Sequence, residues 1–353
     1  MPAETRPRIA VVLFNLGGPD RPEAIRPFLL NLFNDKAILR VPFFIRPVLA
    51  RVIAGRRLKP ATENYALLGG RSPLLGLTQA QARALEAALP EVEARCFIAM
   101  RYWHPFSDEA ARAVKAFQPH EVVLLPLYPQ FSTTTTGSSL AAWREAAARV
   151  GLVAPVTTLC CWPEDAAYVE ATATIVRRSW EQATAATGGV AVRVLFSAHG
   201  LPEAIVRAGD PYQWQVERTA RAILMAWGPD APTDWTICYQ SRATPQKWLE
   251  PSTDQEIARA ARDGVGVLVV PIAFVSEHSE TLVELDVEYR QLAESLGVPA
   301  YFRTSTQNDD RGFIAALAGM VRRARADGPG LCSHAGGRIC PAEFAGCPFL
   351  VRA

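Results

Sequence analysis

The sequence lacks a long apolar run. Its longest runs, 122–129 and 265–275, are far shorter than the roughly 20 residues that a helix needs to cross a bilayer. Residues 9–16 are also apolar, but no small-residue cleavage pattern follows them, so we predict a buried first strand and not a signal peptide. We expect a cytoplasmic protein, whose attachment to the inner face of a membrane would be peripheral.

A large excess of charge of either sign is missing too. The chain has 37 basic and 35 acidic residues, which leaves a net charge of +2. Proteins that bind nucleic acid need a strongly basic surface, so this balance argues against a nucleic-acid partner. Hydrophobic residues make up 49% of the chain, which is enough for a large core and argues against disorder.

Three widespread catalytic motifs are absent. The first apolar run ends in NLGGPD (15–20), which does not fit the G-x-G-x-x-G pattern of dinucleotide-binding folds. There is also no Walker A pattern and no G-x-S-x-G. Dinucleotide dehydrogenases, P-loop NTPases and α/β-hydrolases are therefore disfavoured.

Cysteines in C-x2-C pairs are absent, although the chain has seven cysteines. An odd number without an export signal favours free thiols or metal ligands over disulfides. Cys332, Cys340 and Cys347 follow one another in the tail, and Cys160 or Cys161 at a strand end could supply a fourth ligand. Side chains alternate along a strand, so one of that pair should face the site, and we prefer Cys161. Four thiolates suit a [2Fe–2S] cluster or zinc, and the plainer alternative is a set of exposed thiols.

What the sequence does contain is a regular alternation of short apolar runs and amphipathic stretches, which predicts a doubly wound α/β fold. Several runs are apolar throughout, as is typical of parallel strands that are covered on both faces. The predicted strands are 8–14, 94–100, 121–127, 156–160, 191–197, 235–239, 266–272 and 299–302. The predicted helices are 21–33, 78–89, 107–117, 164–185, 211–227, 253–262, 280–296 and 309–325.

Four predicted strands fall in each half of the chain, which indicates two similar domains with parallel four-stranded sheets. We expect an N-terminal domain over 1–165, a C-terminal domain over 166–325 and a cysteine-containing extension over 326–353. The first domain includes an unusually long connection, 35–75, and the family resemblance described below implies an apolar lip over about 35–58 of it.

The centre of this lip, residues 41–53, is dense in large apolar side chains for a surface connection. They include Phe43, Phe44, Ile45, Val48 and Leu49. With Arg46 and Arg51 placed to meet lipid headgroups, the segment is predicted to be partly exposed and to contact a membrane. The alternative is ordinary packing in the core.

Polar residues gather where predicted strands end, which is where open α/β sheets bind their ligands. His199 lies just beyond the strand 191–197, where an imidazole can accept a proton or bind a metal near neutral pH. A structural hydrogen bond is an equal alternative for this histidine. Beyond the strand 121–127, the polar loop 126–140 could bind an anion at the start of the next helix. Capping of that helix by Ser138 or Ser139 is the simpler reading.

Acidic residues crowd the junction after the strand 266–272. They are Glu277, Glu280, Glu284 and Glu288, and His278 lies among them. Glu280, Glu284 and Glu288 are spaced to line one helix face. A solvated surface is the preferred interpretation for Glu288. Glu280 begins the helix at the active edge, where a cation or a proton must offset the like charges, so the group suits a divalent metal or a proton relay.

In a series of ordered motifs, the chain resembles the ferrochelatases, which insert Fe²⁺ into a porphyrin to make haem. The resemblance covers roughly residues 8–325. Its motifs are NLGGP (15–19), AGRR (54–57), Tyr65 followed by GGRSPL (69–74), MRYWHP (100–105), YPQFSTTTTGSS (128–139), FSAHGLP (196–202), CYQSRATPQKWL (238–249) and PIAFVSEHSETLVELDVEY (271–289). It implies two Rossmann-like domains that hold protoporphyrin IX in the cleft between them, with protohaem and two protons as products.

The resemblance also implies roles for single residues. His199 would accept pyrrole protons or bind the substrate iron, and Glu280 would face it across the cleft. The residues of an adjoining metal path would be Glu277, His278, Glu284 and Trp248. The residues that line the porphyrin would be Tyr65, Ser72, Arg101, Tyr128 and Ser139, with Arg56 and Arg57 as partners of the propionates.

One departure from the family concerns the cluster. Animal members hold a [2Fe–2S] cluster with closely spaced tail cysteines and a cysteine in the polar loop, where this chain has Thr133. The cluster is therefore argued from Cys332, Cys340, Cys347 and Cys161 or Cys160, a pattern similar to cluster-bearing bacterial members. Zinc is the alternative occupant.

Two other functions compete with iron insertion. One is a chelatase that inserts cobalt or nickel into another tetrapyrrole, although such relatives are not expected to share both the lip and the SEHSETL stretch. The other is a haem or metal carrier on the same fold, which would need no paired acid and base groups. Protoporphyrin or coproporphyrin as the substrate, and a monomer or a homodimer, both stay open.

Overall fold

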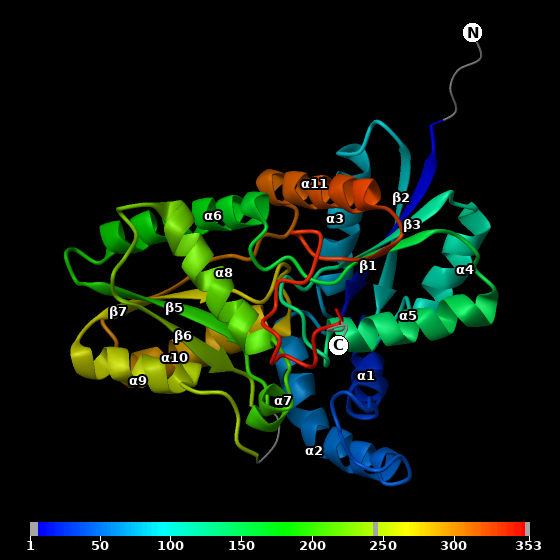
Figure 1. Cartoon of the computed structure of the whole chain (residues 1–353). Helices are drawn as coiled ribbons and strands as arrows, with labels where there is room; N and C mark the ends of the chain where they lie inside the picture. Colours follow the sequence, from blue (N-terminus) through cyan, green and yellow to red (C-terminus); the bar gives the residue numbers. More distant parts are fainter. Residues whose placement is uncertain (1–5, 243–245, 350–353) are drawn as a thin grey trace. The chain divides into compact units, whose positions relative to one another are not determined.

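The computed structural model describes residues 6–242 and 246–349, so residues 243–245 of the 238–249 motif lie outside the described residues. The chain divides into two compact units, whose elements are labelled in Figure 1. Unit 1 comprises Met1–Trp162 and Leu317–Ile339, and unit 2 comprises Pro163–Ala316 and Cys340–Ala353. Each unit is built on one parallel sheet, which confirms the predicted α/β fold class.

The sheet of unit 1 has the strand order β2-β1-β3-β4-β9, and all neighbouring pairs are parallel. Its strands are β1 (Arg8–Asn15), β2 (Glu93–Met100), β3 (Glu121–Pro126), β4 (Val156–Leu159) and β9 (Gly330–Cys332). Strand β1 is completely buried from Ile9 to Phe14. Covering on both faces explains why its sequence is apolar without alternation.

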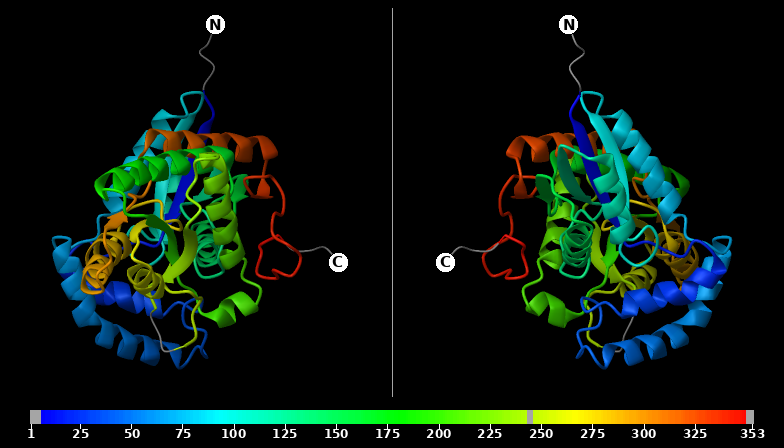
Figure 2. Two further views of the ribbon diagram at one scale, coloured as in Figure 1. Left: turned by 90° about the vertical axis from the view of Figure 1, so that its left-hand side faces the viewer. Right: turned by 90° about the vertical axis from the view of Figure 1, so that its right-hand side faces the viewer.

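Helices cover this sheet and form a second, smaller core beside it. Helices α4 (Ser107–Phe117) and α5 (Thr136–Val150) pack their small residues and Trp143 against β1 and β3. Helices α1 (Ile25–Phe33) and α2 (Arg46–Leu67) lie side by side in Figures 1 and 2 and pack around Tyr102 and Trp103. The other helices of this half are η1 (Pro22–Ala24) and α3 (Leu74–Ala87).

The sheet of unit 2 has the strand order β6-β5-β7-β8, again with parallel neighbours. Its strands are β5 (Val192–His199), β6 (Trp235–Gln240), β7 (Gly266–Pro271) and β8 (Tyr301–Arg303). Its helices are α6 (Ala166–Ala186), α7 (Glu203–Arg207), α8 (Tyr212–Trp227), α9 (Thr253–Asp263), the π-helix η2 (Glu280–Glu288) and α10 (Tyr289–Ser295). Helix α11 (Arg311–Asp327) begins in unit 2 and ends in unit 1.

The structure adds elements that the sequence did not predict. Strand β9 extends the predicted four-stranded sheet of unit 1 at its edge beside β4, and its three residues contain no apolar run that could have signalled it. Helix α2 was not among the predicted helices because its apolar residues form no single stripe and Pro60 lies inside it. The predicted helix 280–296 is a π-helix for its first nine residues and an α-helix only from Tyr289.

The lip is partly exposed, as the sequence predicted. Leu49, however, is half-buried against the core, and the half-buried Arg46 donates to the backbone carbonyls of Leu39 and Val41, so neither has the outward role expected of it. Phe43 retains 78% and Phe44 66% of its accessible surface, and Ile45 and Val48 are exposed beside them. The rings of Phe43 and Phe44 contact each other edge to face. Among all the residues that the structure describes, no helix has both the length and the hydropathy required to span a membrane.

Candidate active site

His199 ends strand β5, where its imidazole is oriented by backbone groups. Its Nδ1 atom lies 2.7 Å from the carbonyl oxygen of Gly200, and the Tyr212 hydroxyl donates to the His199 carbonyl at 3.0 Å. A carbonyl oxygen only accepts, so Nδ1 carries the proton and a neutral His199 has its lone pair on Nε2. Gly200 is required here because a Cβ atom would lie 2.9 Å from the Gln240 carbonyl oxygen.

Glu280 lies between two histidines. Its Oε1 atom is 3.6 Å from Nε2 of His199, and its Oε2 atom is 3.4 Å from Nε2 of His278. The Nδ1 atom of His278 lies 3.2 Å from the Ser276 carbonyl oxygen, so this ring too is protonated on Nδ1. Both Nε2 atoms therefore face a carboxylate oxygen, and each pair of lone pairs repels unless a proton or a cation lies between them.

The pKa values of the two carboxyl groups of this site, Glu280 and Glu284, are shifted in opposite directions. Burial alone would raise the pKa of Glu280, but the charges that His199 and His278 carry when they are protonated, and the hydrogen bond that a protonated His278 donates, lower it to about 2. Burial and the charge of Glu280 together raise the pKa of Glu284, although Ser241 and Gln240 oppose this with hydrogen bonds. A carboxylate that stays ionised beside one that binds a proton more readily is typical of acid–base sites.

Glu277 does not lie with these groups but in an ion pair of its own. Nη1 of Arg303 is 2.8 Å from Oε1 of Glu277, and the same arginine holds Asp286 with its Nη2 atom at 2.6 Å. The Thr306 amide also donates to Oε1 of Glu277, at 2.9 Å. Burial would raise the pKa of Glu277, but the charge of Arg303 and these hydrogen bonds lower it below 4.5.

Replacing Glu277 by glutamine is therefore expected to lower the free energy of unfolding by about 2 kcal/mol at neutral pH, because hydrogen bonds to charged groups are lost. The folded pKa of Glu277 is depressed, so its stabilising contribution is full above the ordinary value of 4.5 and is lost as the pH falls through the folded value. Urea denaturation at neutral pH and near pH 3 tests this, since the difference between the two proteins should shrink in acid. An equal difference at both pH values would contradict the assignment.

Trp248 and Glu288 lie at the margins of this group. Trp248 is buried and forms a bridge with Pro202, and a Cβ atom at Gly200, next to His199, would lie 3.3 Å from the Trp248 ring. Glu288, at the end of η2, is exposed, in agreement with its interpretation as part of a solvated surface. Of the four residues predicted for the metal path, His278 contacts Glu280 directly, and Glu284 is linked to the Glu280 backbone through Gln240. Glu277 is paired with Arg303, and Trp248 lies beside the turn at Gly200.

Unit 1 contains the residues predicted for porphyrin binding. A Cβ atom at Gly18 would lie 2.5 Å from Oγ of Ser72 and 3.8 Å from the Tyr65 hydroxyl, so the NLGGP motif meets both predicted residues. Arg56 and Arg57 are exposed on α2, as a role toward propionates requires. The hydroxyls of Tyr128 and Ser139 lie 3.5 Å apart.

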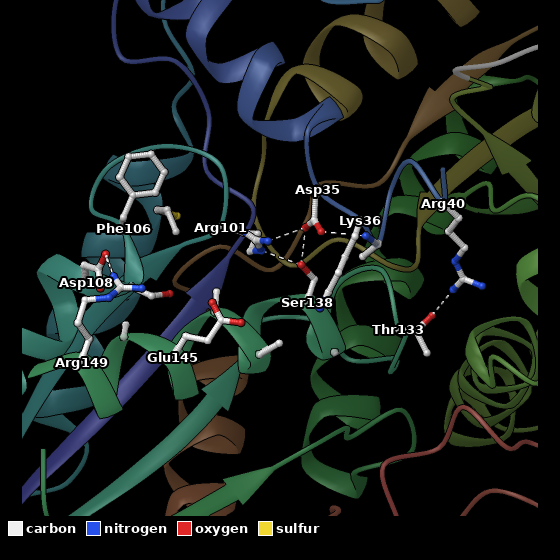
Figure 3. Close-up of a pocket in the computed structure, with 17 residues that line it drawn as sticks. Asp35, Lys36, Arg40, Arg101, Phe106, Asp108, Thr133, Ser138, Glu145 and Arg149 are labelled. Atoms are coloured by element: carbon white, nitrogen blue, oxygen red, sulfur yellow. Dashed lines mark hydrogen bonds and ion pairs between the residues drawn. The ribbon is translucent and has the colours of Figure 1, made fainter. Parts of the chain in front are cut away.

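Arg101 is held in place by a buried carboxylate that the sequence did not single out. Asp35 accepts from Nη2 of Arg101 at 2.8 Å and from the Tyr102 hydroxyl at 3.0 Å, and Nε of Arg101 donates to Ser138 at 2.6 Å. Figure 3 shows Asp35, Arg101 and Ser138 together in a cavity of about 450 Å³. In the sequence, Asp35 is a single acidic residue after the apolar helix α1, and such a residue also suits a solvent-exposed turn.

The polar loop leads directly into α5. The N-cap is Thr135 and no side chain caps the helix, so neither Ser138 nor Ser139 has the capping role considered above. Ser138 instead lies in the first turn and binds Arg101. Arg40 donates to the Thr133 hydroxyl at 3.0 Å, at the loop position where animal members have a cysteine.

The cysteines predicted for the cluster are buried and free of disulfides. In unit 1, the Cys160 amide donates to the Cys332 carbonyl at 2.8 Å and the sulfur atoms of Cys160 and Cys161 are 3.3 Å apart. In unit 2, the Gln215 amide donates to Sγ of Cys340 at 3.2 Å. Within residues 6–242 and 246–349, no group of three or more His, Cys, Asp or Glu side chains is arranged to hold a metal ion.

The family model described as Ferrochelatase matches residues 8–325. The chain is 55% identical to the Ferrochelatase of Caulobacter vibrioides over 345 residues, which cover 97% of each chain. It is 50% identical to the Ferrochelatase of Hyphomonas neptunium, with 97% of this chain and 94% of the relative covered.

Among solved structures, the chain is similar to SirB from Bacillus subtilis with Fe³⁺. The TM-score is 0.52 at 12% sequence identity, and the match covers 91% of this chain and 96% of that chain. The sirohydrochlorin chelatase SirB from Bacillus subtilis subspecies spizizenii in complex with cobalt gives a TM-score of 0.51 at the same identity. At this identity the likeness supports the fold alone.

Proposed function

The chain belongs to the ferrochelatase family, and from this we propose that it inserts Fe²⁺ into protoporphyrin IX, forming protohaem and releasing two protons. The observation that carries this proposal is the Glu280 carboxylate between Nε2 of His199 and Nε2 of His278. Metallation needs a base for the pyrrole protons and negative charge near an incoming cation. This arrangement offers both within a few ångströms.

Each residue of the site has a role in this mechanism. Nε2 of neutral His199 accepts a pyrrole proton, since its Nδ1 proton is engaged by the Gly200 carbonyl. The ionised Glu280 stabilises the imidazolium that results, and it also attracts Fe²⁺. Glu284, whose pKa is raised by burial and by the charge of Glu280, is the proton acceptor beyond it. The porphyrin nitrogens, once deprotonated, bind the iron.

Metallation by the purified chain tests this function directly. Under anaerobic conditions, Fe²⁺ and protoporphyrin IX should give the absorption spectrum of protohaem at a rate above the protein-free control. Parallel reactions with coproporphyrin, and with Co²⁺ or Ni²⁺, compare the alternative substrates. Tight haem binding without turnover would favour the carrier and contradict the enzyme.

We propose that the lip binds the inner face of a membrane, which suits a poorly soluble porphyrin product. Its support is the set of exposed side chains of Phe43, Phe44, Ile45 and Val48, with the exposed cation Arg51 next to them. Phe43→Ser with Phe44→Ser should lower the partition coefficient onto lipid vesicles by at least about tenfold, because two aromatic rings that move from water into the bilayer contribute several kcal/mol. The measurement is vesicle sedimentation.

Val153→Ser is the matched control for the lip. Val153 is 94% exposed on another part of unit 1, so this variant also loses an exposed apolar group. It should bind vesicles as the unaltered protein does. Equal binding by the double phenylalanine variant would refute the membrane role of the lip.

We propose that Cys332, Cys340, Cys347 and Cys161 or Cys160 hold a [2Fe–2S] cluster, with zinc as the alternative. The support is chemical: the thiols are buried and form no disulfide, and Gln215 donates to one sulfur. Burial, Asp327 and Cys161 raise the pKa of the Cys332 thiol to about 11, so a bound cation would be needed to displace its proton. The group would tie the tail to the rest of the chain.

Five variants test the cluster, each with one of the candidate cysteines replaced by serine: Cys160, Cys161, Cys332, Cys340 and Cys347. Four of these variants should lose the visible absorbance and the acid-labile sulfide of the protein. The fifth, in which the cysteine is not a ligand, should keep both. Cys96→Ser and Cys238→Ser are controls, because these cysteines lie on β2 and β6, outside the predicted set. Colourless protein from anaerobic purification that contains stoichiometric zinc would exclude the cluster.

A further inference from the structure

The last residue of β6, Gln240, and the next residue, Ser241, form a corner that binds the Glu284 carboxyl through several hydrogen bonds. Nε2 of Gln240 donates to Oε2 of Glu284 at 3.0 Å, and the Ser241 amide donates to Oε1 at 2.9 Å. The Ser241 hydroxyl also donates to Oε2. A third residue, Tyr289, adds its hydroxyl to Oε1 at 3.3 Å.

The orientation of the Gln240 amide follows from its other partners. Its Nε2 atom also donates to the backbone carbonyl of Glu280 at 3.0 Å, and a carbonyl oxygen can only accept. Its Oε1 atom accepts from the Ser197 hydroxyl at 2.9 Å, and Ser197 in turn lies 2.9 Å from the Thr253 hydroxyl. Gln240, Ser197 and Thr253 are fully buried, so each of these hydrogen bonds is costly to break.

Ser241 has a backbone conformation that residues with a side chain rarely adopt. Its φ angle is +64°, in the left-handed region. In this conformation the amide and the hydroxyl of Ser241 both donate to the Glu284 carboxyl. Strained residues of this kind persist where the surrounding structure holds them, and they gather at functional sites.

The same corner also contacts the strand that carries His199. Gln240 and His199 are register partners in β6 and β5, and the Gly200 amide donates to the Gln240 carbonyl at 2.7 Å. Gln240 thus joins the end of β5 to the first turn of η2 and to Glu284. A change in its side chain would alter the placement of Glu280 and Glu284 relative to His199.

We propose that Gln240 and Ser241 are positioning residues for metal insertion: they orient the Glu284 carboxyl and hold the first turn of η2 beside His199. This inference rests on the proposed function. Neither residue contacts the pyrrole nitrogens in this role, and both act through Glu280 and Glu284. Their loss should therefore reduce the use of Fe²⁺ and leave porphyrin binding unchanged.

Gln240→Met keeps the length of the side chain and removes the amide. It should lower kcat/KM for Fe²⁺ by about tenfold or more, as small misplacements of reacting groups do. Gln240→Glu should lower it further, because it places a carboxylate against Glu284. The dissociation constant of the porphyrin, measured by quenching of protein fluorescence, should not change. Gln291→Met, on the exposed face of α10, is the matched control.

Two variants of Ser241 distinguish an effect on the orientation of Glu284 from an effect on the stability of the fold. Ser241→Ala loses the hydroxyl and keeps the unfavourable φ, whereas Ser241→Gly loses the hydroxyl and relieves the φ, since glycine readily populates the left-handed region. We expect a higher Tm for Ser241→Gly than for Ser241→Ala, with kcat/KM for Fe²⁺ equally low in both. Recovery of activity together with Tm in the glycine variant would show a merely structural role.

The outcomes distinguish this inference from the function on which it rests. If the unaltered chain does not metallate protoporphyrin, the proposed function fails. If it does, and Gln240→Met keeps its kcat/KM for Fe²⁺ despite a lowered Tm, the function stands and the positioning role is overturned.

Discussion

Replacing Glu280 by glutamine should lower kcat for metal insertion by at least ~10²-fold, the usual effect of losing a general acid–base group. Glutamine has the same size but no charge. It can neither stabilise a protonated His199, 3.6 Å away, nor attract Fe²⁺. Against the effect of burial, the charges of protonated His199 and His278 lower the pKa of Glu280 to about 2, so the carboxylate is ionised once His199 has accepted a proton, which is the state in which its loss should slow the reaction.

Glu288→Gln is the matched control for this variant. Glu288 lies on the same π-helix and is exposed, so it tests for the general effect of removing one negative charge from η2. Initial rates of haem formation and the binding of protoporphyrin should be measured for both variants. Turnover close to that of the unaltered protein in Glu280→Gln would remove Glu280 from the mechanism.

The sheets of this protein were predictable because parallel strands leave a strong signal. A strand covered on both faces, such as β1 or β7, must be apolar throughout, and no polar alternation weakens the pattern. The site followed from the same rule. Once the strands were placed, His199 had to lie at the end of one of them and Glu280 shortly after the end of the strand β7, which pairs with β5.

The groups that orient these residues were not predictable in the same way. Gln240 is the last residue of β6 and has the sequence signal of an ordinary polar residue at a strand end, and Arg303 lies on the short edge strand β8. What distinguishes them is burial and the partners that folding brings together from distant segments, such as Arg303 with Glu277 and Asp286. A single sequence contains the residues but not these pairings. The positive φ of Ser241 likewise carries no residue-type signal, since glycine or asparagine would be the usual choice.

Residues 280–295 of the predicted helix 280–296 are helical, but the type of helix differs from the prediction over the first nine of them. The spacing of Glu280, Glu284 and Glu288 predicted one face of an α-helix, and the structure has a π-helix over these residues. Single-turn π-bulges are the common form and often occur at functional sites. Here the wider helix follows directly on the His278 turn, so that the Glu280 carboxylate meets both imidazoles while its backbone carbonyl accepts from Gln240.

Replacing His199 by alanine should also lower kcat by at least ~10²-fold, because in the proposed mechanism His199 is the base that accepts the pyrrole proton. The fold should be retained, since the Tyr212 hydroxyl binds the backbone carbonyl of residue 199 and not its side chain. Added imidazole should restore part of the activity by occupying the vacated space, whereas a structural defect would not respond. His104→Ala, at an exposed histidine paired with Glu109, should behave as the unaltered protein does.

The double variant His199→Ala with Glu280→Gln separates a working pair from two independent contributions. If the carboxylate acts by stabilising the protonated imidazole, it has little left to stabilise once His199 is gone. The double variant should then be only slightly slower than the slower single variant, as for residues that act as a unit. If the two losses multiply instead, the residues contribute independently. In that case Glu280 would act on the metal, through the electrostatic attraction of Fe²⁺, and His199 alone would handle the proton.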